Sequence, residues 1–305
     1  MTERVELVCG DPAFVDLTFA GLDGLPGPGE ERHARDLLRS PGGAATVAIG
    51  AARLGLSVAL ATPLGADPEG DFLRAALAAE GVRCADRTVS RTPVTAVLPW
   101  DGERAMATFL PQPPLQPADV AAFAPRAVVL SLPWLHCAPA GAALYVTVGD
   151  AEARAAAGAL PDGLAAARAL IVNAREATLL AGEDDPVAAA RKLAETVPRV
   201  VVTLGPDGAL AVERGELVRV PGVAVAAVDT TGAGDLFTAT YIWSELRGAG
   251  PGLRLHWACL AAALSVRVPT AVAGAQSIDG LAAAGKERGL ALPASMTTEI
   301  LGGSE

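Results

Sequence analysis

The sequence predicts an α/β fold in which helices cover both faces of a mostly parallel central sheet, with a small β-sheet lid. Two observations support this prediction. Short apolar runs alternate with helical patterns along most of the 305 residues, which is typical of right-handed β-α-β units. Residues 95–109 instead alternate apolar and polar positions around Asp101-Gly102. This dipeptide is a strong hairpin turn, so the segment indicates antiparallel strands.

The buried elements follow from these patterns. Apolar runs bounded by turn residues are expected to form the central strands, at 5–9, 57–61, 127–131, 144–148, 169–172 and 200–204. Helical patterns predict helices at 46–54, 70–80, 175–181, 186–196, 236–246 and 253–266. Asp185-Pro186 combines an N-cap residue with proline at the first helical position. Asp67 and Asp279 are expected to cap helices in the same way.

Two segments that break the alternation are expected to form the lid. They span about 12–40, which is rich in Gly and Pro, and 90–112, and both are inserted into one α/β domain covering 1–290. The stretch 209–228 predicts two or three further antiparallel strands near the sheet edge, with Arg214-Gly215 as a turn. The last residues, 291–305, are expected to form a loosely ordered tail.

Composition excludes several classes of protein. The net charge is −10 without a basic stripe, so no nucleic acid partner is expected. The four cysteines are far apart and none forms a C-x-x-C pair, so neither a zinc site nor a disulfide framework is indicated. No apolar run is long enough to span a bilayer and no signal peptide is recognisable. We therefore expect a cytoplasmic protein without a membrane partner.

The most informative segment is 228–237, in which a strand ends, a Gly-rich turn follows and a helix begins near Gly234. The small residues Gly232, Ala233 and Gly234 let the backbone approach a ligand, and N–H groups at a helix start make an anion hole. Asp235 at its mouth could accept a proton from an attacking hydroxyl. The alternative is an Asp that caps a helix after an ordinary loop. The spacing fits neither the Walker A motif nor G-x-G-x-x-G, which argues against a dinucleotide-dependent oxidoreductase.

The run Asp-Thr-Thr-Gly-Ala-Gly-Asp at 229–235, followed by Leu-Phe, resembles the C-terminal signature of the ribokinase-like (PfkB) carbohydrate kinase family. Further segments resemble family landmarks in the family's order: 10–16, 41–55, 173–176 and 201–208. The resemblance covers about residues 5–280. It implies a ribokinase-like three-layer αβα sandwich and ATP-dependent phosphorylation of a hydroxyl group on a small sugar-like acceptor.

The resemblance also implies roles for individual residues. Asp235 would be the catalytic base, with the amides of Gly232, Ala233 and Gly234 as the anion hole. The acceptor would be bound by residues of the first lid segment and of the helix after it: Asp16, Gly42, Gly43 and Thr46. A carboxylate such as Asp16 can accept from two hydroxyls at once, which suits a diol. The alternative for the Gly-Gly pair is a tight turn before a helix.

The nucleotide side of the implied site contains Asn173, Thr203, Gly205 and Gly208. Glu176 would help to hold Mg²⁺ through water, although Asn173 and Glu176 also have the spacing of a capping box. Asp229 and Thr231 match positions that bind a monovalent cation, usually K⁺, in some family members. Their alternative is turn chemistry.

The sequence departs from the family pattern in two places. The family signature usually has an acceptor-contacting Asn near the position of Thr46, and Thr offers a hydroxyl in place of an amide. The stretch 132–148 leaves room for only a turn or two where the family commonly has a helix. The acceptor could therefore be a sugar or a nucleoside, and a non-catalytic sugar or nucleotide sensor is the remaining alternative. Lid strands in this family often pair between subunits, which makes a homodimer a hypothesis.

Overall fold

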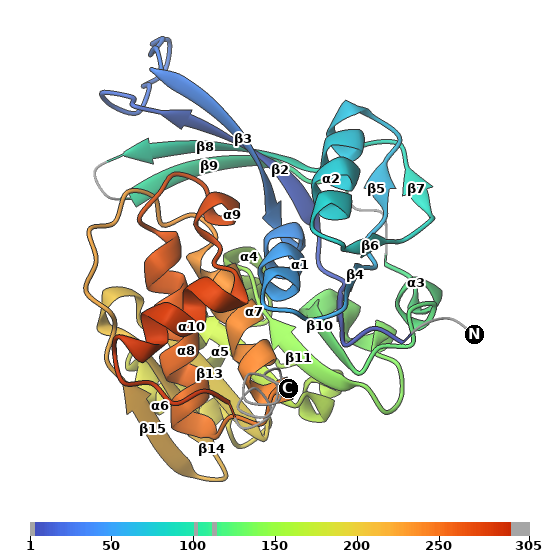
Figure 1. Ribbon diagram of the computed structural model, residues 1–305, viewed down its shortest axis with the longest axis vertical. Coiled ribbons are helices and arrows are strands. Elements are labelled where there is room, and N and C mark those ends of the chain that lie inside the picture. The colour runs from blue at the N-terminus through green and yellow to red at the C-terminus, as the bar shows by residue number, and fades with distance from the viewer. Residues whose placement is uncertain (1–3, 101–102, 112–114, 294–305) are drawn as a thin grey trace, which may run out of the picture.

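The computed structural model describes residues 4–100, 103–111 and 115–293, and this part of the chain contains a nine-stranded sheet between two layers of helices (Figure 1). From one edge to the other the strands are β6 (Arg83–Cys84), β4 (Val58–Leu60), β1 (Leu7–Cys9), β10 (Ala127–Ser131), β11 (Ala143–Thr147), β12 (Ala169–Asn173), β13 (Arg199–Thr203), β14 (Ala209–Glu213) and β15 (Glu216–Val220). The first seven strands in this order, β6 through β13, run parallel to one another. Strand β14 pairs antiparallel with β13, and β15 pairs antiparallel with β14. The predicted fold class is confirmed.

Both faces of the sheet are apolar. Successive residues of a strand point to opposite faces, so each strand contributes to two cores. On β1, Leu7 and Cys9 belong to one core and Val8 to the other. The first core packs under α1 (Ala44–Arg53), α2 (Pro68–Ala79), α7 (Ala233–Leu246), α8 (Pro251–Ser265) and α10 (Ile278–Lys286). The second packs under α3 (Pro117–Ala121), α4 (Asp150–Ala155), α5 (Ala174–Ala181) and α6 (Pro186–Leu193).

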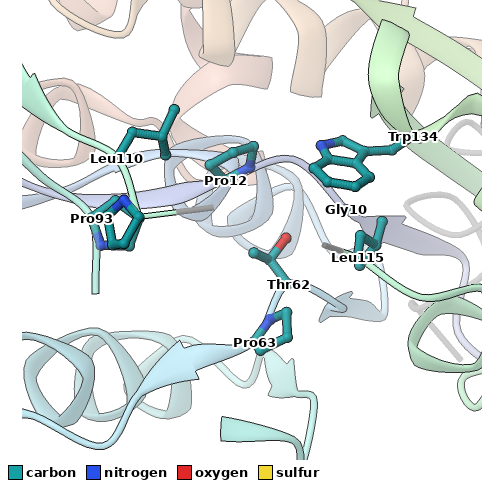
Figure 2. Close-up of a pocket in the computed structure, with 9 residues that line it drawn as sticks. Gly10, Pro12, Thr62, Pro63, Pro93, Leu110, Leu115 and Trp134 are labelled. Carbon is teal, nitrogen blue, oxygen red and sulfur yellow. The ribbon is translucent and has the colours of Figure 1, made fainter. Parts of the chain in front are cut away.

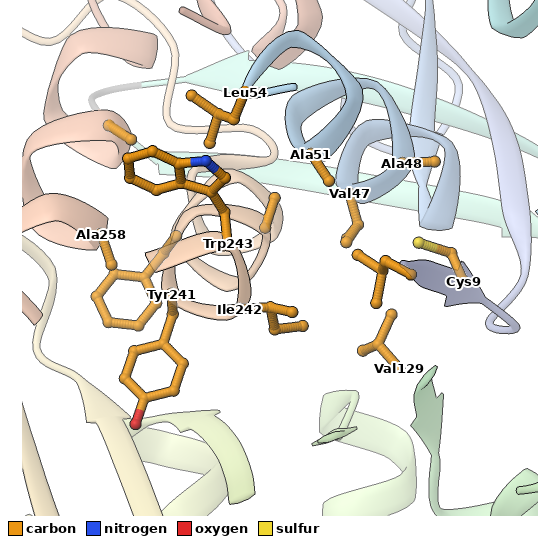
Figure 3. Packing of buried hydrophobic residues seen from close by; sticks show 14 of the residues in the cluster. Cys9, Val47, Ala48, Ala51, Leu54, Val129, Tyr241, Ile242, Trp243 and Ala258 are labelled. Atoms are coloured by element: carbon orange, nitrogen blue, oxygen red, sulfur yellow. The ribbon is translucent and has the colours of Figure 1, made fainter. Parts of the chain in front are cut away.

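Small residues bring α1 close to α7 in the first core. Val47, Ala48 and Ala51 of α1 belong to the same core cluster as Ile242 and Trp243 of α7 (Figure 3). A Cβ on Gly50 would lie 2.5 Å from Cδ2 of Leu236, so a larger residue would force the Leu236 side chain to move. Since α1 follows the first lid segment and α7 begins at the Gly-rich turn, this packing fixes two parts of the predicted site relative to each other.

The lid is a separate four-stranded sheet of order β3-β2-β8-β9, seen at the top of Figure 1. Its strands are β2 (Ala13–Ala20), β3 (Asp36–Gly43), β8 (Val94–Trp100) and β9 (Glu103–Phe109). They occupy the two segments expected to form it, and β8 and β9 form the predicted antiparallel pair. The turn at 101–102 lies outside the described residues, as does the tail from 294. The small parallel pair β5 (Leu64–Gly65) and β7 (Thr88–Val89) was not predicted.

The structure confirms some predicted helix ends and corrects others. Asp67 and Asp185 accept from the amides of Gly70 and Ala188, as predicted. The prediction for Asp279 was wrong, because the Oγ atom of Ser277 accepts from the amide of Gly280 and Asp279 lies within the first turn of α10. Ser277 has the extended backbone that an N-cap requires.

The region after β10 is short, as expected. It forms a 3₁₀ turn, η1 (Leu132–Cys137), rather than a full helix. The segment 209–228 supplies two strands, β14 and β15, joined at Arg214-Gly215. None of the helices in the described ranges is both long and apolar enough to cross a membrane.

Candidate active site

The Gly-rich turn leads directly into the N-terminus of α7. Gly232 is the N-cap residue with φ of 71°, a left-handed conformation, and a Cβ there would overlap the methyl group of Ala271. Asp229 holds the turn, since its two carboxylate oxygens accept from the amides of Thr231 (2.8 Å) and Thr270 (2.9 Å). The first amides of a helix have no partner within the helix. The amide of Ala233 makes only a long hydrogen bond, 3.4 Å to the Thr230 carbonyl, so this end of α7 can present N–H groups to an anion.

Asp235 lies in the first turn of α7, next to these amides. Burial and the negative charges of Asp16, Asp11 and Glu176 together raise its pKa to about 8, and the positive charge of Arg104 opposes this shift. These carboxylates come from different elements and meet where α7 begins. A carboxyl with a raised pKa in a cluster of acidic groups is typical of a catalytic site.

Asp16 faces Gly42 across the pair of strands β2 and β3. Asp16 pairs with Ser40 and Gly42 with Phe14, and a Cβ on Gly42 would overlap the Asp16 carboxylate. Burial raises the pKa of Asp16 to about 6, although its hydrogen bond with Thr95 and the charge of Arg104 oppose this shift. The absence of a side chain at Gly42 therefore makes the room that the carboxylate occupies.

We predict that Gly42→Ala displaces Asp16 and raises the KM for the acceptor about tenfold or more, with a smaller effect on the KM for the nucleotide. The new methyl group meets the end of a short side chain, so the carboxylate moves and the fold remains. Acceptor and nucleotide KM values of the purified variant check this prediction. Gly27→Ala in the β2–β3 connection, where a Cβ meets only Glu30 at 3.5 Å, is the matched control. Equal acceptor KM values in the two variants would contradict the role of Gly42.

Gly43 and Thr46 lie between the lid and the Gly-rich turn. Gly43 has φ of 57° and is the N-cap of α1, where a Cβ would lie 2.6 Å from the carbonyl oxygen of Pro12. Thr46 is only 1% exposed, and its hydroxyl donates to the Pro41 carbonyl at 3.2 Å. Its methyl carbon would lie 3.4 Å from a Cβ on Gly232. Thr46 thus borders both glycine turns, and its contact with the acceptor stays a prediction.

Asn173 and Glu176 form a capping box at the start of α5. Oδ1 of Asn173 accepts from the amide of Glu176 at 2.9 Å, and Oε2 of Glu176 accepts from the amide of Asn173 at 2.8 Å. Burial raises the pKa of Glu176 to about 7. The capping interpretation is therefore correct at the level of structure, and the box fixes both side chains near Asp235.

The other predicted nucleotide residues follow along the same sheet edge. Thr203 ends β13 directly beside Asn173. Gly205 and Gly208 flank the next turn with φ of 59° and 97°, and a Cβ on Gly208 would overlap the Val220 carbonyl. They follow β13, whereas Asn173 ends the neighbouring strand β12. A crevice outside the carboxyl ends of parallel strands is where α/β sheets bind ligands.

Arg104 was missed by sequence reasoning. It lies on β9 of the lid, and its Nη1 atom donates to Oγ1 of Thr230 at 2.8 Å. Arg104 thus joins the lid to the Gly-rich turn and places a positive charge near Asp16 and Asp235. Only the alternation of β9 indicated the face on which Arg104 lies, and its contact Thr230 is 126 residues away in the sequence.

Asp11 also belongs to the acidic cluster, although no local pattern marked it as a site residue. Its carboxylate accepts from the amide of Ser131 and from the hydroxyl of Thr147 (2.8 Å). Burial raises the pKa of Asp11 to about 7 despite these hydrogen bonds. Because both oxygens are engaged, Asp11 joins the ends of β1, β10 and β11 beneath the site.

The described side chains near the site do not form a complete set of metal ligands, so a cation there would be held largely by water or phosphate. In the described ranges, no three His, Cys, Asp or Glu side chains gather as a metal site. The Oγ1 atom of Thr231 is buried and has no hydrogen-bond partner among the described residues. An unpaired buried hydroxyl beside Asp229 is chemically compatible with a monovalent cation, and this site stays a prediction.

Comparison with known proteins identifies the family. Residues 8–277 match the model of the pfkB family carbohydrate kinases. The chain belongs to this family. A fructokinase from Klebsiella pneumoniae is 33% identical over 293 residues, covering 81% of this chain and 92% of the relative. The resemblance inferred from the sequence motifs is thus confirmed.

Solved pfkB-like kinases have the same fold. A ribokinase from Arabidopsis thaliana, complexed with ribose and ATP, matches with a TM-score of 0.76 and 24% identity, covering 92% of this chain and 99% of that one. A putative ribokinase II from E. coli, in complex with ATP and Mg²⁺, matches with a TM-score of 0.77 and 19% identity, covering 93% and 99%. The three-layer sandwich with its lid is therefore the ribokinase fold.

Proposed function

We propose that this pfkB family protein transfers the γ-phosphoryl group of ATP to a hydroxyl group of a small sugar-like acceptor. The observation that carries the proposal is the position of Asp235 in the first turn of α7, where a buried carboxyl adjoins helix N–H groups. A base and an anion hole side by side are what hydroxyl phosphorylation requires.

In the proposed reaction, Asp235 accepts the proton of the acceptor hydroxyl as the acceptor oxygen bonds to the γ-phosphorus. The bond between this phosphorus and the bridging oxygen breaks, and the electron pair leaves with ADP. The amides of Gly232, Ala233 and Gly234 stabilise the charge on the transferred group. Asp16 accepts hydrogen bonds from other acceptor hydroxyls in the space that Gly42 leaves open.

ATP as the donor is supported by the two structural relatives that contain it. Thr203, Gly205 and Gly208 would line its site at the end of β13. Asn173 and Glu176 would orient waters around Mg²⁺, which usually keeps several waters in such sites. When bound, Mg²⁺ would neutralise charge on the phosphates. Asp229 and Thr231 are our candidates for a K⁺ site, supported by the buried hydroxyl of Thr231.

Glu176→Gln separates the capping role of this residue from its proposed metal role. Glutamine can still accept from the backbone amide of Asn173 but loses the hydrogen bond from Nδ2 of Asn173, so the melting temperature should fall only slightly. Loss of the carboxylate should raise the Mg²⁺ concentration for half-maximal rate about tenfold or more, as for other residues that orient metal-bound water. A Mg²⁺ titration of the rate checks this prediction, with the exposed Glu195→Gln as control. An unchanged Mg²⁺ requirement would leave Glu176 with capping alone.

The fructokinase relative supports a free sugar with a hydroxymethyl group as the acceptor. A nucleoside acceptor is the alternative within the family. The test is an ADP-release assay with Mg²⁺-ATP against sugars, sugar phosphates and nucleosides, with and without K⁺. Release that depends on one acceptor would establish the kinase and identify its substrate. Thermal stabilisation by ATP without release for any acceptor would favour a sensor.

We also propose that the lid pairs with the lid of a second copy to form a homodimer. Leu37, Trp100 and Phe109 are 54%, 44% and 47% exposed and share the lid face opposite Asp16. An uncovered apolar sheet face of this kind favours association. Sedimentation equilibrium should give twice the monomer mass, and Trp100→Lys should shift it toward the monomer.

A further inference from the structure

A small apolar pocket lies at the base of the lid, and the proposed mechanism does not use it. Pro12, Leu110, Leu115 and Trp134 line it together with Thr62 (Figure 2). The pocket is small and open to solvent at its mouth. The lining comes from four places: the ends of β1 and β4, the start and end of the lid hairpin, the segment before α3, and η1.

The pocket offers little to a polar ligand. Three further lining residues are prolines, which have no backbone N–H: Pro63, Pro93 and Pro111. Among the described side chains of the lining, only Thr62 and Trp134 have polar groups. The Thr62 hydroxyl already donates to the carbonyl oxygen of Asp11 at 2.6 Å. A nucleobase would leave several donors and acceptors without partners here, which is unfavourable, whereas a hydrocarbon group would not.

The pocket adjoins the acceptor site along the lid strand β9. Side chains alternate between the faces of a strand, so Arg104 and Thr108 share one face. Arg104 contacts Thr230 beside the Gly-rich turn. Thr108 contacts Thr95 at 3.2 Å between the hydroxyl oxygens, and Thr95 pairs with Asp16. Leu110 follows Thr108 by two residues, or about 7 Å, and it lines the pocket.

A second connection leads to the pocket from the other side. The carbonyl oxygen of Pro12 accepts from the amide of Ala44 at 3.1 Å, and Ala44 follows the glycine pair that borders Asp16. An acceptor bound along β9 would therefore place its reacting hydroxyl near Asp235 and other hydroxyls at Asp16. Its far end, about one sugar ring away, would meet Leu110 and Trp134.

We propose that the acceptor carries an alkyl or aryl substituent at the end opposite the phosphorylated hydroxyl, and that Pro12, Leu110 and Trp134 bind this substituent. The inference rests on the proposed kinase function, because it assigns the orientation of the acceptor from Asp235 and Asp16. The recognised feature is a hydrocarbon group attached to a polyol, whether it comes from an alkyl or an aryl glycoside.

The test compares D-ribose and D-fructose with their methyl, n-butyl and phenyl furanosides, and with adenosine, in the ADP-release assay. Each buried methylene group should raise kcat/KM about fourfold, so n-butyl and phenyl glycosides should exceed the free sugar at least tenfold. The phenyl and n-butyl series distinguish aryl from alkyl sources. Relative to D-ribose, the kcat/KM of adenosine should increase less than that of the phenyl glycoside. An equal or larger increase for adenosine would overturn the hydrocarbon assignment.

Variants test the location of the subsite. Leu110→Ser and Trp134→Ala should each raise the KM for the phenyl glycoside about tenfold, while the KM for the free sugar changes less than twofold. Leu217→Ser is the matched control, because Leu217 and Leu110 are 38% and 37% exposed and Leu217 lies on β15. Equal KM increases for sugar and glycoside would mean that these residues do not bind the substituent.

The outcomes separate this inference from the kinase proposal. If the free sugar is phosphorylated and its glycosides have no higher kcat/KM, the inference is overturned and the proposed function remains intact. No ADP release with any acceptor would overturn the proposed function. In that case, calorimetric titration of the phenyl glycoside into the wild-type protein and Trp134→Ala tests the pocket alone, and equal affinities would overturn it as well.

Discussion

Asp235→Asn should lower kcat by a factor of about 10² to 10⁴, the usual contribution of a positioned general base. Asparagine has nearly the same shape and cannot accept the proton, so the loss falls on the transition state. The amides of the first turn of α7 remain in place, because Gly232 and not the Asp235 side chain sets the start of the helix. The dissociation constant for ATP should therefore remain close to the wild-type value.

Single-turnover rates and calorimetric ATP titrations measure these two quantities separately. Asp279→Asn is a suitable control, because Asp279 also lies in the first turn of a helix, α10. Near-wild-type turnover of Asp235→Asn would remove Asp235 from the role of base. A parallel loss of ATP affinity would mean that the substitution damaged the anion site instead.

The second large effect concerns pH and Arg104. Burial and neighbouring carboxylates raise the pKa of Asp235 to about 8, so its basic form increases as the pH rises. We expect kcat/KM to rise with pH through neutrality and to level off above about 8. Arg104 opposes the upward shift. Arg104→Gln should therefore move the midpoint to higher pH and lower the rate at pH 7.

Arg104→Lys provides the sharper comparison, because lysine keeps the charge and loses the planar guanidinium. Its midpoint should stay near that of the wild type, even if its rate falls. Arg91→Gln controls for loss of a lid charge, since Arg91 lies beside Phe109 on the opposite face. A pH profile of kcat/KM that is identical in the wild type and Arg104→Gln would contradict the electrostatic role. Unfolding would instead change the melting temperature.

The sequence predicted the central strands well because each is a short apolar run buried on both faces. Strand β10, for example, has the expected bounds, 127–131. The two-residue strands β5, β6 and β7 were missed, since two residues have no periodicity. The helix α7 begins at Ala233, next to the start near Gly234 that the Gly-rich motif indicated and three residues before the helical pattern of 236–246. Its first turn contains Ala233 and Gly234, which give no apolar pattern, and the left-handed Gly232 sets the boundary instead.

The candidate site also contains residues that the sequence predicts and residues that it does not. Asp235, Gly232 and Asp229 lie within one short motif, so their proximity was predictable from the sequence. The contact between Asp16 and Gly42 depends on the register of β2 and β3, which no local pattern indicates. The resemblance had assigned both residues to the acceptor without this contact. Arg104 and Asp11 reach the cluster through contacts with Thr230 and with Thr147, more than 100 residues away. No local property of the chain records such distances.

The two halves of the lid are attached to the molecule differently. Strand β3 ends at Gly43 and α1 begins at the next residue, so β2 and β3 are continuous with the core. The hairpin of β8 and β9 is bounded by loops at both ends. It carries Arg104, and Leu110 follows it, whereas Asp16 and Asp235 lie elsewhere. Protein engineers could therefore exchange this hairpin between relatives as a cassette, provided that Arg104 is kept, and retarget the enzyme while Asp16 and Asp235 stay in place.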